Sequence, residues 1–186
     1  DWDVLWAAAA ECNIPISFHT TGPNLREPND EAMAKEYENE FRMTKLSLFQ
    51  VCGAEYLASI IFSGACERYP GFKFVLGECG VTWIPHVLNR MDEEYEDRIE
   101  VLSLPKKPSE YWRRQGYTTY QHELSLQEIL PLVGEDNVVW GSDYPHPDGI
   151  WPDSQKWIEQ DLAGISAETR RKLTLDNAGK LYGFLT

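Results

Sequence analysis

The sequence lacks the patterns of two common kinds of protein. Its 17 basic residues stand against 30 acidic ones, a formal net charge of −13, so it has few of the lysine and arginine side chains that bind phosphates. Its longest weakly polar stretch, residues 56–66, falls short of the roughly 20 apolar residues that a membrane-spanning helix needs. We therefore expect neither a nucleic-acid partner nor a membrane protein.

Cysteine is scarce, and the four cysteines form no Cys-x-x-Cys pair, which argues against a disulfide framework. We expect small core residues in a reducing compartment at Cys12, Cys52, Cys66 and Cys79. No targeting segment is visible at the start, so a cytoplasmic location is expected. A Gly-x-Ser-x-Gly elbow and a reactive Cys-His arrangement are also missing, which disfavours a metal-free hydrolase with a nucleophilic side chain.

Four short runs of strand-forming residues alternate with helical patterns. The runs cover residues 14–18, 72–77, 117–121 and 137–142. Such alternation favours βαβ units and a parallel sheet. A complete TIM-type (β/α)₈ barrel needs about 250 residues, so four units in a chain of 186 residues fit the second half of one. We predict an α/β fold, a single domain over residues 1–186 that resembles a half-barrel.

Helical periodicity predicts the connecting segments. The expected helices cover residues 2–10, 30–45, 46–69, 85–95, 109–114, 125–133, 152–162 and 166–182. Ser109, Ser125 and Ser166 are the expected N-caps of three of them. Residues 20–30 are rich in turn formers and are expected to form, with the helix that follows, part of a lid.

Each of the four strands ends near a side chain that can bind a metal or move a proton. These side chains are His19, Glu78, His122 and Asp143. In a parallel sheet or barrel the C-terminal ends of the strands lie on one face, so residues far apart in the sequence meet there. We expect the chemistry of this protein at that edge of the sheet.

Asp143 and His19 are the predicted metal ligands. An aspartate at a strand end can bind a divalent cation through one oxygen and take a proton from metal-activated water through the other. His19 can supply an imidazole ligand to zinc. Taken singly, Asp143 could cap the following turn and His19 could be a structural residue. Together across the mouth of a barrel they favour a metal site.

Glu78 is the second candidate catalytic residue. It lies between Gly77 and Gly80, which would let the backbone turn tightly at the strand end. Glu78 could be a third ligand or a general acid or base. The alternative is a salt-bridged glutamate on the loop that begins the next helix.

Four further residues are candidates for substrate binding. His122 and His146 could each donate a hydrogen bond to a substrate oxygen, although His146, between two prolines, could instead pin its loop. Trp83 and Tyr144 could wall a substrate pocket, or could pack under loops. His86, in the middle of an amphipathic pattern, is expected to be structural.

Several segments together carry a family resemblance. They are residues 64–70, 77–85, 141–146 and 177–184, with His19 at the end of its strand. In combination they resemble the C-terminal half of the amidohydrolase-related family that includes aminocarboxymuconate semialdehyde decarboxylase. The resemblance implies a metal-dependent barrel that hydrolyses, hydrates or decarboxylates small carboxylated or aromatic substrates. It makes His19 the ligand of the fifth strand and Asp143 the ligand and base of the eighth.

The chain departs from that family pattern in two places. Glu78 stands where decarboxylases of the family carry a catalytic histidine, which weakens the case for decarboxylation. The His-x-His pair that the family places on its first strand is missing. Catalytic zinc takes three protein ligands and a water, whereas His19 and Asp143 are two, with Glu78 as a third.

The sequence therefore predicts part of a longer enzyme, with zinc as the expected ion and manganese as the alternative. Alone, the chain is expected to bind metal poorly. The other hypothesis is a non-catalytic half-barrel that pairs with a second copy of itself, or with the missing N-terminal half, to cover its exposed sheet edges.

Overall fold

The computed structural model describes residues 2–21, 31–98, 101 and 104–185. Within them a four-stranded parallel sheet has the order β1-β2-β3-β4, with bounds β1 (Ile16–His19), β2 (Phe74–Gly77), β3 (Gly116–Tyr120) and β4 (Val138–Trp140). The predicted α/β class and parallel topology are confirmed. Most of the expected lid loop, residues 22–30, lies outside the described residues.

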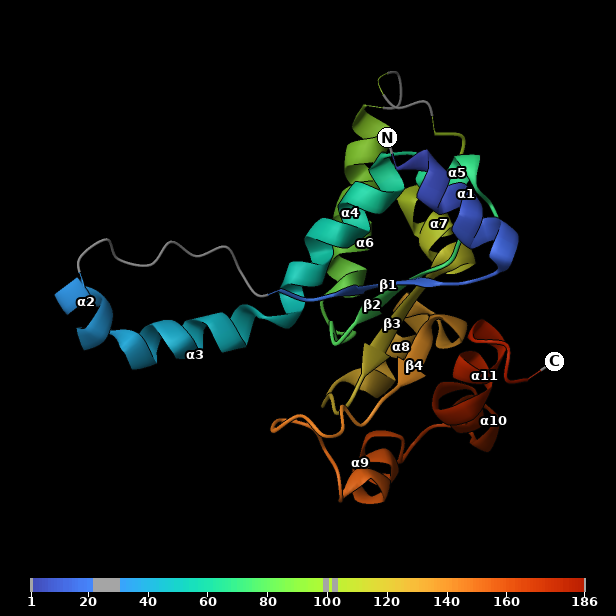
Figure 1. Cartoon of the computed structure of the whole chain (residues 1–186). Helices are drawn as coiled ribbons and strands as arrows, with labels where there is room; N and C mark the ends of the chain where they lie inside the picture. Colours follow the sequence, from blue (N-terminus) through green and yellow to red (C-terminus); the bar gives the residue numbers. More distant parts are fainter. Residues whose placement is uncertain (1, 22–30, 99–100, 102–103, 186) are drawn as a thin grey trace.

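The helices connect the strands in chain order. They are α1 (Asp3–Cys12), α2 (Glu31–Glu36), α3 (Glu38–Leu48), η1 (Gln50–Cys52), α4 (Gly53–Phe62), α5 (Ala65–Arg68), α6 (Ile84–Asp97), α7 (Pro108–Gln115), α8 (Leu126–Val133), η2 (Glu135–Asn137), α9 (Ser154–Asp161), α10 (Ala167–Arg171), η3 (Lys172–Asp176) and α11 (Asn177–Leu181). In Figure 1, α1, α4, α6 and α7 lie together above the sheet, and α9, α10 and α11 lie below it. Helices α2 and α3 extend away from the rest of the molecule.

The core forms where β2 meets the helices. Phe74 and Leu76 of β2 are completely buried, and Trp112 of α7 packs edge-on against Phe74 with ring centroids 6.1 Å apart. The indole N–H of Trp112 donates to the carbonyl of Val133 at 2.9 Å, so its polar atom is satisfied inside the core. Each such buried side chain stabilises the fold by about 1.5 to 3 kcal/mol.

Two buried asparagines join the last elements to the sheet. The side-chain amide of Asn137 donates to the carbonyl of Gly116 at 2.7 Å, and that of Asn177 donates to the carbonyl of Val138 at 2.8 Å. Asn177 begins the C-terminal motif that carried part of the family resemblance. Its role in this structure is to hold α11 against β4.

The expected long helices are interrupted. The predicted helix over residues 46–69 is divided by the 3₁₀ turn η1 and again at Gly64, which has a φ of 76° and separates α4 from α5. Glycine has no Cβ and adopts this left-handed conformation readily, so it ends α4 where apolar periodicity alone predicts continuation. The predicted helix over residues 30–45 is divided at Tyr37. The final expected helix contains the π-helical turn η3.

One of the three predicted serine caps is confirmed. The hydroxyl oxygen of Ser166 accepts the backbone N–H of Thr169 at 3.1 Å. Ser125 makes no capping hydrogen bond. Ser109 lies inside α7, where both its backbone N–H and its hydroxyl donate to the carboxylate of Asp92, at 2.9 and 2.6 Å. The prediction for Ser109 was wrong because a carboxylate from α6 supplies the acceptor.

The cysteine prediction holds for two positions. Cys66 and Cys79 are buried, whereas Cys12 is exposed and Cys52 is partly exposed; all four are free thiols. Burial raises the pKa of both buried thiols to about 12.

Among the described residues no single helix has the length and apolar character to cross a membrane. One pair, α3 with residues Gln50–Phe62, bent by 52°, meets those two criteria together. Its second part buries Leu57 and Ile61 in the protein core.

Candidate functional site

The strand register brings the predicted site residues to one edge of the sheet. His19 is paired with Gly77, the residue before Glu78, and Tyr120 is paired with Trp140. Because all four strands are parallel, the residues that follow them emerge on the same side. The sequence-based expectation of a shared edge is therefore matched by the topology.

Glu78 and Asp143 both adopt a left-handed backbone conformation just after their strands. Their φ angles are 55° and 57°, and for a residue with a Cβ this conformation costs about 1 to 2 kcal/mol. The backbone N–H of Glu78 donates to the Thr119 hydroxyl at 2.8 Å, which helps hold the turn. The tight turn was expected from Gly77 and Gly80. Gly80 does have a positive φ of 65°, but the first residue after the strand with a positive φ is Glu78 itself.

His19 forms an ion pair with Glu78. The distance from His19 Nε2 to Glu78 Oε1 is 2.9 Å, and His19 Nδ1 lies 2.5 Å from the carbonyl oxygen of Thr20. A carboxylate and a carbonyl only accept hydrogen bonds, so both ring nitrogens must carry protons in this arrangement. The pKa of His19 is raised, chiefly by the Thr20 carbonyl, against a smaller opposing effect of burial, and further by Glu78 and Asp143.

Asp143 lies close enough to His19 for its negative charge to contribute to the raised pKa of His19, so the two predicted ligands are near each other. His19 nevertheless holds a proton on the nitrogen that faces Glu78. A histidine must be deprotonated at the nitrogen that binds a metal, so His19 would have to exchange its bond to Glu78 for a bond to the ion.

A second group of side chains at the same edge has the spacing of a metal site. Glu78, Asp143 and His146 each offer one ligand atom, and these atoms lie within 4.8 Å of one another. His146 Nδ1 is 3.0 Å from Asp143 Oδ2 and also contacts Asp148. The pKa of His146 is raised, first by Asp148 and, against a small effect of burial, also by Asp143.

The donor set of this group suits a divalent cation. Two carboxylates and an imidazole are ligands that zinc and manganese accept, and three protein ligands are the usual number in a catalytic zinc site. His146, predicted to bind substrate, thus lies beside the predicted ligand Asp143. His19 lies next to the group through its bond to Glu78.

His122 is held by a residue that the sequence did not single out. His122 Nδ1 lies 2.7 Å from Asp161 Oδ1, and the Asp161 side chain is only 2% exposed. The other carboxylate oxygen of Asp161 accepts the backbone N–H of Glu123 at 3.2 Å. The His122 ring packs against Trp157, with centroids 4.1 Å apart and the ring planes tilted by 44°. Both Asp161 and Trp157 come from α9, so the chain folds back over the end of β3.

Glu123 is another residue missed by the sequence pattern. Its carboxylate accepts the backbone N–H groups of Val81 and Thr82, at 2.6 and 2.9 Å. It therefore ties the loop after β3 to the loop that carries Glu78. Burial raises the pKa of Glu123, and the hydrogen bonds from Val81 and Thr82 partly offset this effect. No local signal marked Glu123, since its partners lie about forty residues earlier.

The two predicted aromatic residues differ in their surroundings. Trp83 is partly buried against the core, and its indole N–H donates to the carbonyl of Cys79 at 2.6 Å. Tyr144 is 62% exposed and forms an edge-on pair with Trp151, centroids 4.9 Å apart. Tyr144 follows Asp143 directly, so this aromatic pair lies on the loop of the candidate metal group.

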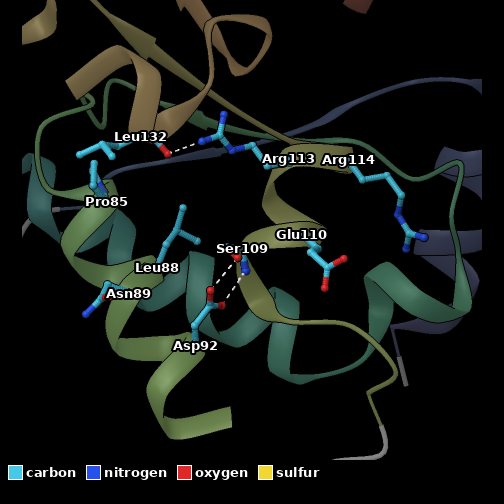
Figure 2. Close-up of a pocket in the computed structure, with 9 residues that line it drawn as sticks. All are labelled: Pro85, Leu88, Asn89, Asp92, Ser109, Glu110, Arg113, Arg114 and Leu132. Atoms are coloured by element: carbon cyan, nitrogen blue, oxygen red, sulfur yellow. Dashed lines mark hydrogen bonds between the residues drawn. The ribbon is translucent and has the colours of Figure 1, made fainter. Parts of the chain in front are cut away.

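A pocket of about 690 Å³ lies elsewhere, in the helical layer. Figure 2 shows it between α6 and α7, with Leu132 of α8 at one end. Its charged groups are engaged in the protein itself: Asp92 accepts from Ser109, and Arg113 donates to the carbonyl of Leu132 at 2.6 Å. None of the predicted site residues lines this pocket. The hydrogen bonds of its polar lining residues link α6, α7 and α8 to one another.

Known proteins match this chain in sequence and in fold. The family model described as Amidohydrolase matches residues 1–184. The chain belongs to the amidohydrolase family. This confirms the resemblance found in the sequence and agrees with a sheet made of half of a TIM barrel.

Three relatives illustrate the match. The 2-amino-3-carboxymuconate-6-semialdehyde decarboxylase of Dictyostelium discoideum is 27% identical over 130 residues, which are 68% of this chain and 35% of the relative. A solved amidohydrolase from Mycobacterium avium subsp. paratuberculosis K-10 is 26% identical with a TM-score of 0.77, over 97% of this chain and 45% of that one. A dihydroxybenzoic acid decarboxylase from Polaromonas sp. JS666, solved with manganese and 2-nitroresorcinol, is 20% identical with a TM-score of 0.72, over 98% of this chain and 54% of that one.

This amidohydrolase chain thus spans between about a third and a half of the length of these relatives.

Proposed function

We propose that this amidohydrolase chain forms the strand-five-to-eight part of a metal-dependent enzyme that hydrolyses or decarboxylates a small carboxylated or aromatic substrate. The observation that carries the proposal is the group of Glu78, Asp143 and His146 at the strand ends, with ligand atoms within 4.8 Å of one another. Membership of the amidohydrolase family supports an enzyme of this kind.

Asp143, Glu78 and His146 would hold a divalent cation, with His19 able to replace Glu78 or join it. When bound, such an ion lowers the pKa of water and polarises a substrate oxygen. Manganese is the ion to test first, because the Polaromonas decarboxylase was solved with it. Zinc, the first expectation from the sequence, is the second ion to test.

The protein side chains divide the remaining work. Asp143, whose Oδ2 lies 3.0 Å from His146 Nδ1, would accept a proton through its other oxygen. Glu78 exchanges a proton with His19 through their 2.9 Å contact. His122, fixed at Nδ1 by Asp161, is left with Nε2 to hydrogen-bond a substrate oxygen. The exposed pair Tyr144 and Trp151 offers an apolar surface for an aromatic or unsaturated part of the substrate.

Hydrolysis and decarboxylation differ in the proton that must be moved. Hydrolysis requires a base that deprotonates water, a role that fits a carboxylate. Decarboxylation requires an acid that protonates the carbon from which carbon dioxide leaves. Glu78 replaces the histidine expected of the decarboxylases, so hydrolysis is the first reaction to assay and decarboxylation the second.

Both ends of the sheet support the idea of a missing half. In the described residues β1 and β4 are the outer strands, and a closed barrel would pair both of them. The chain is expected to bind metal weakly until four further strands complete the barrel. The second candidate function, a non-catalytic half-barrel that only pairs with another half, rests on the same open edges.

Metal titration separates the two candidates. Calorimetry with Mn²⁺ and then Zn²⁺ should show binding by the chain, and the Asp143→Ala, Glu78→Ala and His146→Ala variants should each weaken it. His86→Ala is the matched control, because His86 lies on α6 outside the group. Equal metal binding by all four variants would remove the proposed site and favour the pairing module.

Activity is tested after metal binding is established. The manganese-loaded chain, alone and mixed with the N-terminal half of a family member, would be assayed with lactones, amides and carboxylated phenols. Formation of a hydrolysis product would indicate hydrolysis, and release of carbon dioxide would indicate decarboxylation.

A further inference from the structure

Two polar groups at the C-terminal ends of β3 and β4 are buried without a hydrogen-bond partner among the described residues. They are the hydroxyl of Tyr120 and the indole N–H of Trp140. Tyr120 is 2% exposed, and Trp140 packs against the core. Folded proteins pair nearly all of their buried polar groups with protein atoms or with ordered water, so both groups require an acceptor.

The strand register brings these two donors together. Tyr120 is the partner of Trp140 in the β3–β4 ladder, so both side chains leave the same face of the sheet, from backbones about 4.8 Å apart. The buried indole of Trp112 shows the usual outcome, since its N–H donates to the carbonyl of Val133 at 2.9 Å. Tyr120 and Trp140 therefore share one region of the protein in which an acceptor is needed.

The buried carboxylate of Asp161, from α9, has acceptor capacity to spare near this region. Within the described residues it accepts from His122 Nδ1 at 2.7 Å and from the backbone N–H of Glu123 at 3.2 Å, the long end of the range. An ionised carboxylate offers about four acceptor positions, so these two bonds leave room for another donor. The charge of Asp161 also helps to raise the pKa of Tyr120, after the larger effect of burial, so the two side chains are near each other.

We propose that β3, β4 and α9 together bind one internal water molecule, which accepts from Tyr120 and Trp140 and donates to Asp161. Three hydrogen bonds are the usual number for a buried water. Through this water Tyr120 is a positioning residue for Asp161, the carboxylate that holds His122. An anion fits less well, because Asp161 and Glu123 both place negative charge near the Tyr120 hydroxyl.

A crystal structure of the wild-type chain that resolves ordered water tests the site directly. A water oxygen should lie within about 3.2 Å of Tyr120 Oη, Trp140 Nε1 and one carboxylate oxygen of Asp161. A crystal soaked in bromide should show no anomalous signal there. The proposal would be overturned by a bromide peak, which would indicate an anion, or by a direct hydrogen bond from Tyr120 to Asp161 with no water between them.

Tyr120→Phe separates a paired hydroxyl from an unpaired one by the sign of its effect. If the water is bound, the variant should lower the equilibrium constant for folding by about fivefold, because a hydrogen bond inside the protein is lost. If the hydroxyl has no partner, its removal should leave that constant unchanged or raise it, which would overturn the proposal. Tyr117→Phe is the matched control, because Tyr117 is partly exposed on the opposite face of β3. Urea denaturation measures both variants.

The proton between His122 Nδ1 and Asp161 reports the positioning role. The water competes with His122 for the Asp161 carboxylate, so Tyr120→Phe should strengthen the remaining bond and move the Nδ1 proton resonance downfield in NMR spectra. Tyr117→Phe should leave this resonance in place. An unmoved resonance in Tyr120→Phe would overturn the positioning role. The contribution of His122 to substrate binding rests on the proposed function, whereas these measurements involve neither metal nor substrate, so the two proposals can fail separately.

Discussion

Two histidine–carboxylate pairs at the same edge of the sheet have opposite surroundings. His122 is bonded to Asp161, whose side chain is 2% exposed and which also accepts a backbone N–H. His146 is bonded to Asp143, whose side chain is 15% exposed, and to Asp148, whose side chain is 73% exposed, and the His146 side chain is 57% exposed against 27% for His122. The first pair is fixed by burial and by a helix from another part of the chain. The second lies on a loop.

The difference separates two roles that the sequence could not distinguish. A carboxylate buried among its own hydrogen-bond donors holds a side chain in place, and removing it leaves those donors unsatisfied. Asp143 is bonded to a histidine of its own loop that is 57% exposed, so it can exchange this partner for an ion or a substrate. We therefore expect the His122–Asp161 pair to matter for stability and orientation, and the His146–Asp143 pair for binding.

The largest expected effect is on the exposed pair. Asp143→Ala should reduce manganese affinity by about 100-fold or more, since even the outer partners of metal ligands are worth about 10- to 100-fold. Its effect on the free energy of unfolding should be about 1 to 2 kcal/mol, because alanine keeps the Cβ that strains the left-handed backbone and loses the bond to His146. Calorimetry and urea denaturation measure the two quantities.

Asp148→Ala is the control for Asp143, because Asp148 contacts the same histidine from a side chain that is 73% exposed. It should change manganese affinity little. Equal losses of affinity in the two variants would mean that the negative charge of the loop, and not the position of Asp143, attracts the ion.

The second effect is on the buried pair. Asp161→Ala should lower the free energy of unfolding by about 2 to 4 kcal/mol, because the His122 ring and the Glu123 N–H lose their acceptor inside the protein. Manganese affinity should be much less affected than in Asp143→Ala. Urea denaturation gives the first quantity and calorimetry the second.

Asp161→Asn tests whether Asp161 orients the His122 ring. Asparagine is close to aspartate in size, so the variant leaves no cavity. In the wild type, nitrogen-edited NMR should show the His122 proton on Nδ1, since the carboxylate only accepts. The asparagine amide can donate instead, so the proton should redistribute toward Nε2. An unchanged tautomer would contradict the role of Asp161 as the residue that orients His122.

The smallest expected effect concerns how the free energy of unfolding depends on pH. Glu123 and Glu135 should contribute to this dependence with opposite signs. Burial raises the pKa of Glu123, so the folded state binds its proton more tightly than the unfolded state, and stability is lost as the pH rises from about 4.5 through the raised pKa. Hydrogen bonds from Lys172 and then Thr169 lower the pKa of Glu135, so its contribution is present above about pH 4.5 and is lost as the pH falls through the lowered pKa.

Thermal melts between pH 3 and 8 check these opposite signs. Glu123→Gln should gain stability relative to the wild type as the pH rises, and Glu135→Gln should lose its relative deficit as the pH falls. The same slope in both variants would show that burial of Glu123 is not what shifts its pKa.

Much of the fold followed from local patterns. The four strands were located within two residues of their bounds, because each is a short run rich in β-branched, aromatic or aliphatic residues and is bounded by turn-forming or polar residues. The helices were located less accurately where a single residue overrides periodicity, as Gly64 does between α4 and α5. Ser109 was misassigned because its acceptor, Asp92, comes from a neighbouring helix.

Most of the residues of the candidate site could be predicted from the sequence. His19, Glu78, His122 and Asp143 were predicted because strand ends in a parallel sheet share an edge, and His146 because it follows Asp143 on the same loop. Asp161 and Glu123 gave no signal, since an aspartate at the end of a helix and a glutamate after a strand end are ordinary residues. Their importance comes from partners about forty residues away.

The sequence by itself determined the class of fold, the family and the edge of the sheet where the candidate site lies, because strand periodicity and strand ends are local properties of the chain. Folding decided which histidine stands beside which carboxylate, and which of those carboxylates is shielded from water. The pairings of His19 and His122 depend on how β1 pairs with β2 and where α9 packs, contacts that no neighbouring stretch of sequence contains, whereas His146 meets Asp143 within one loop.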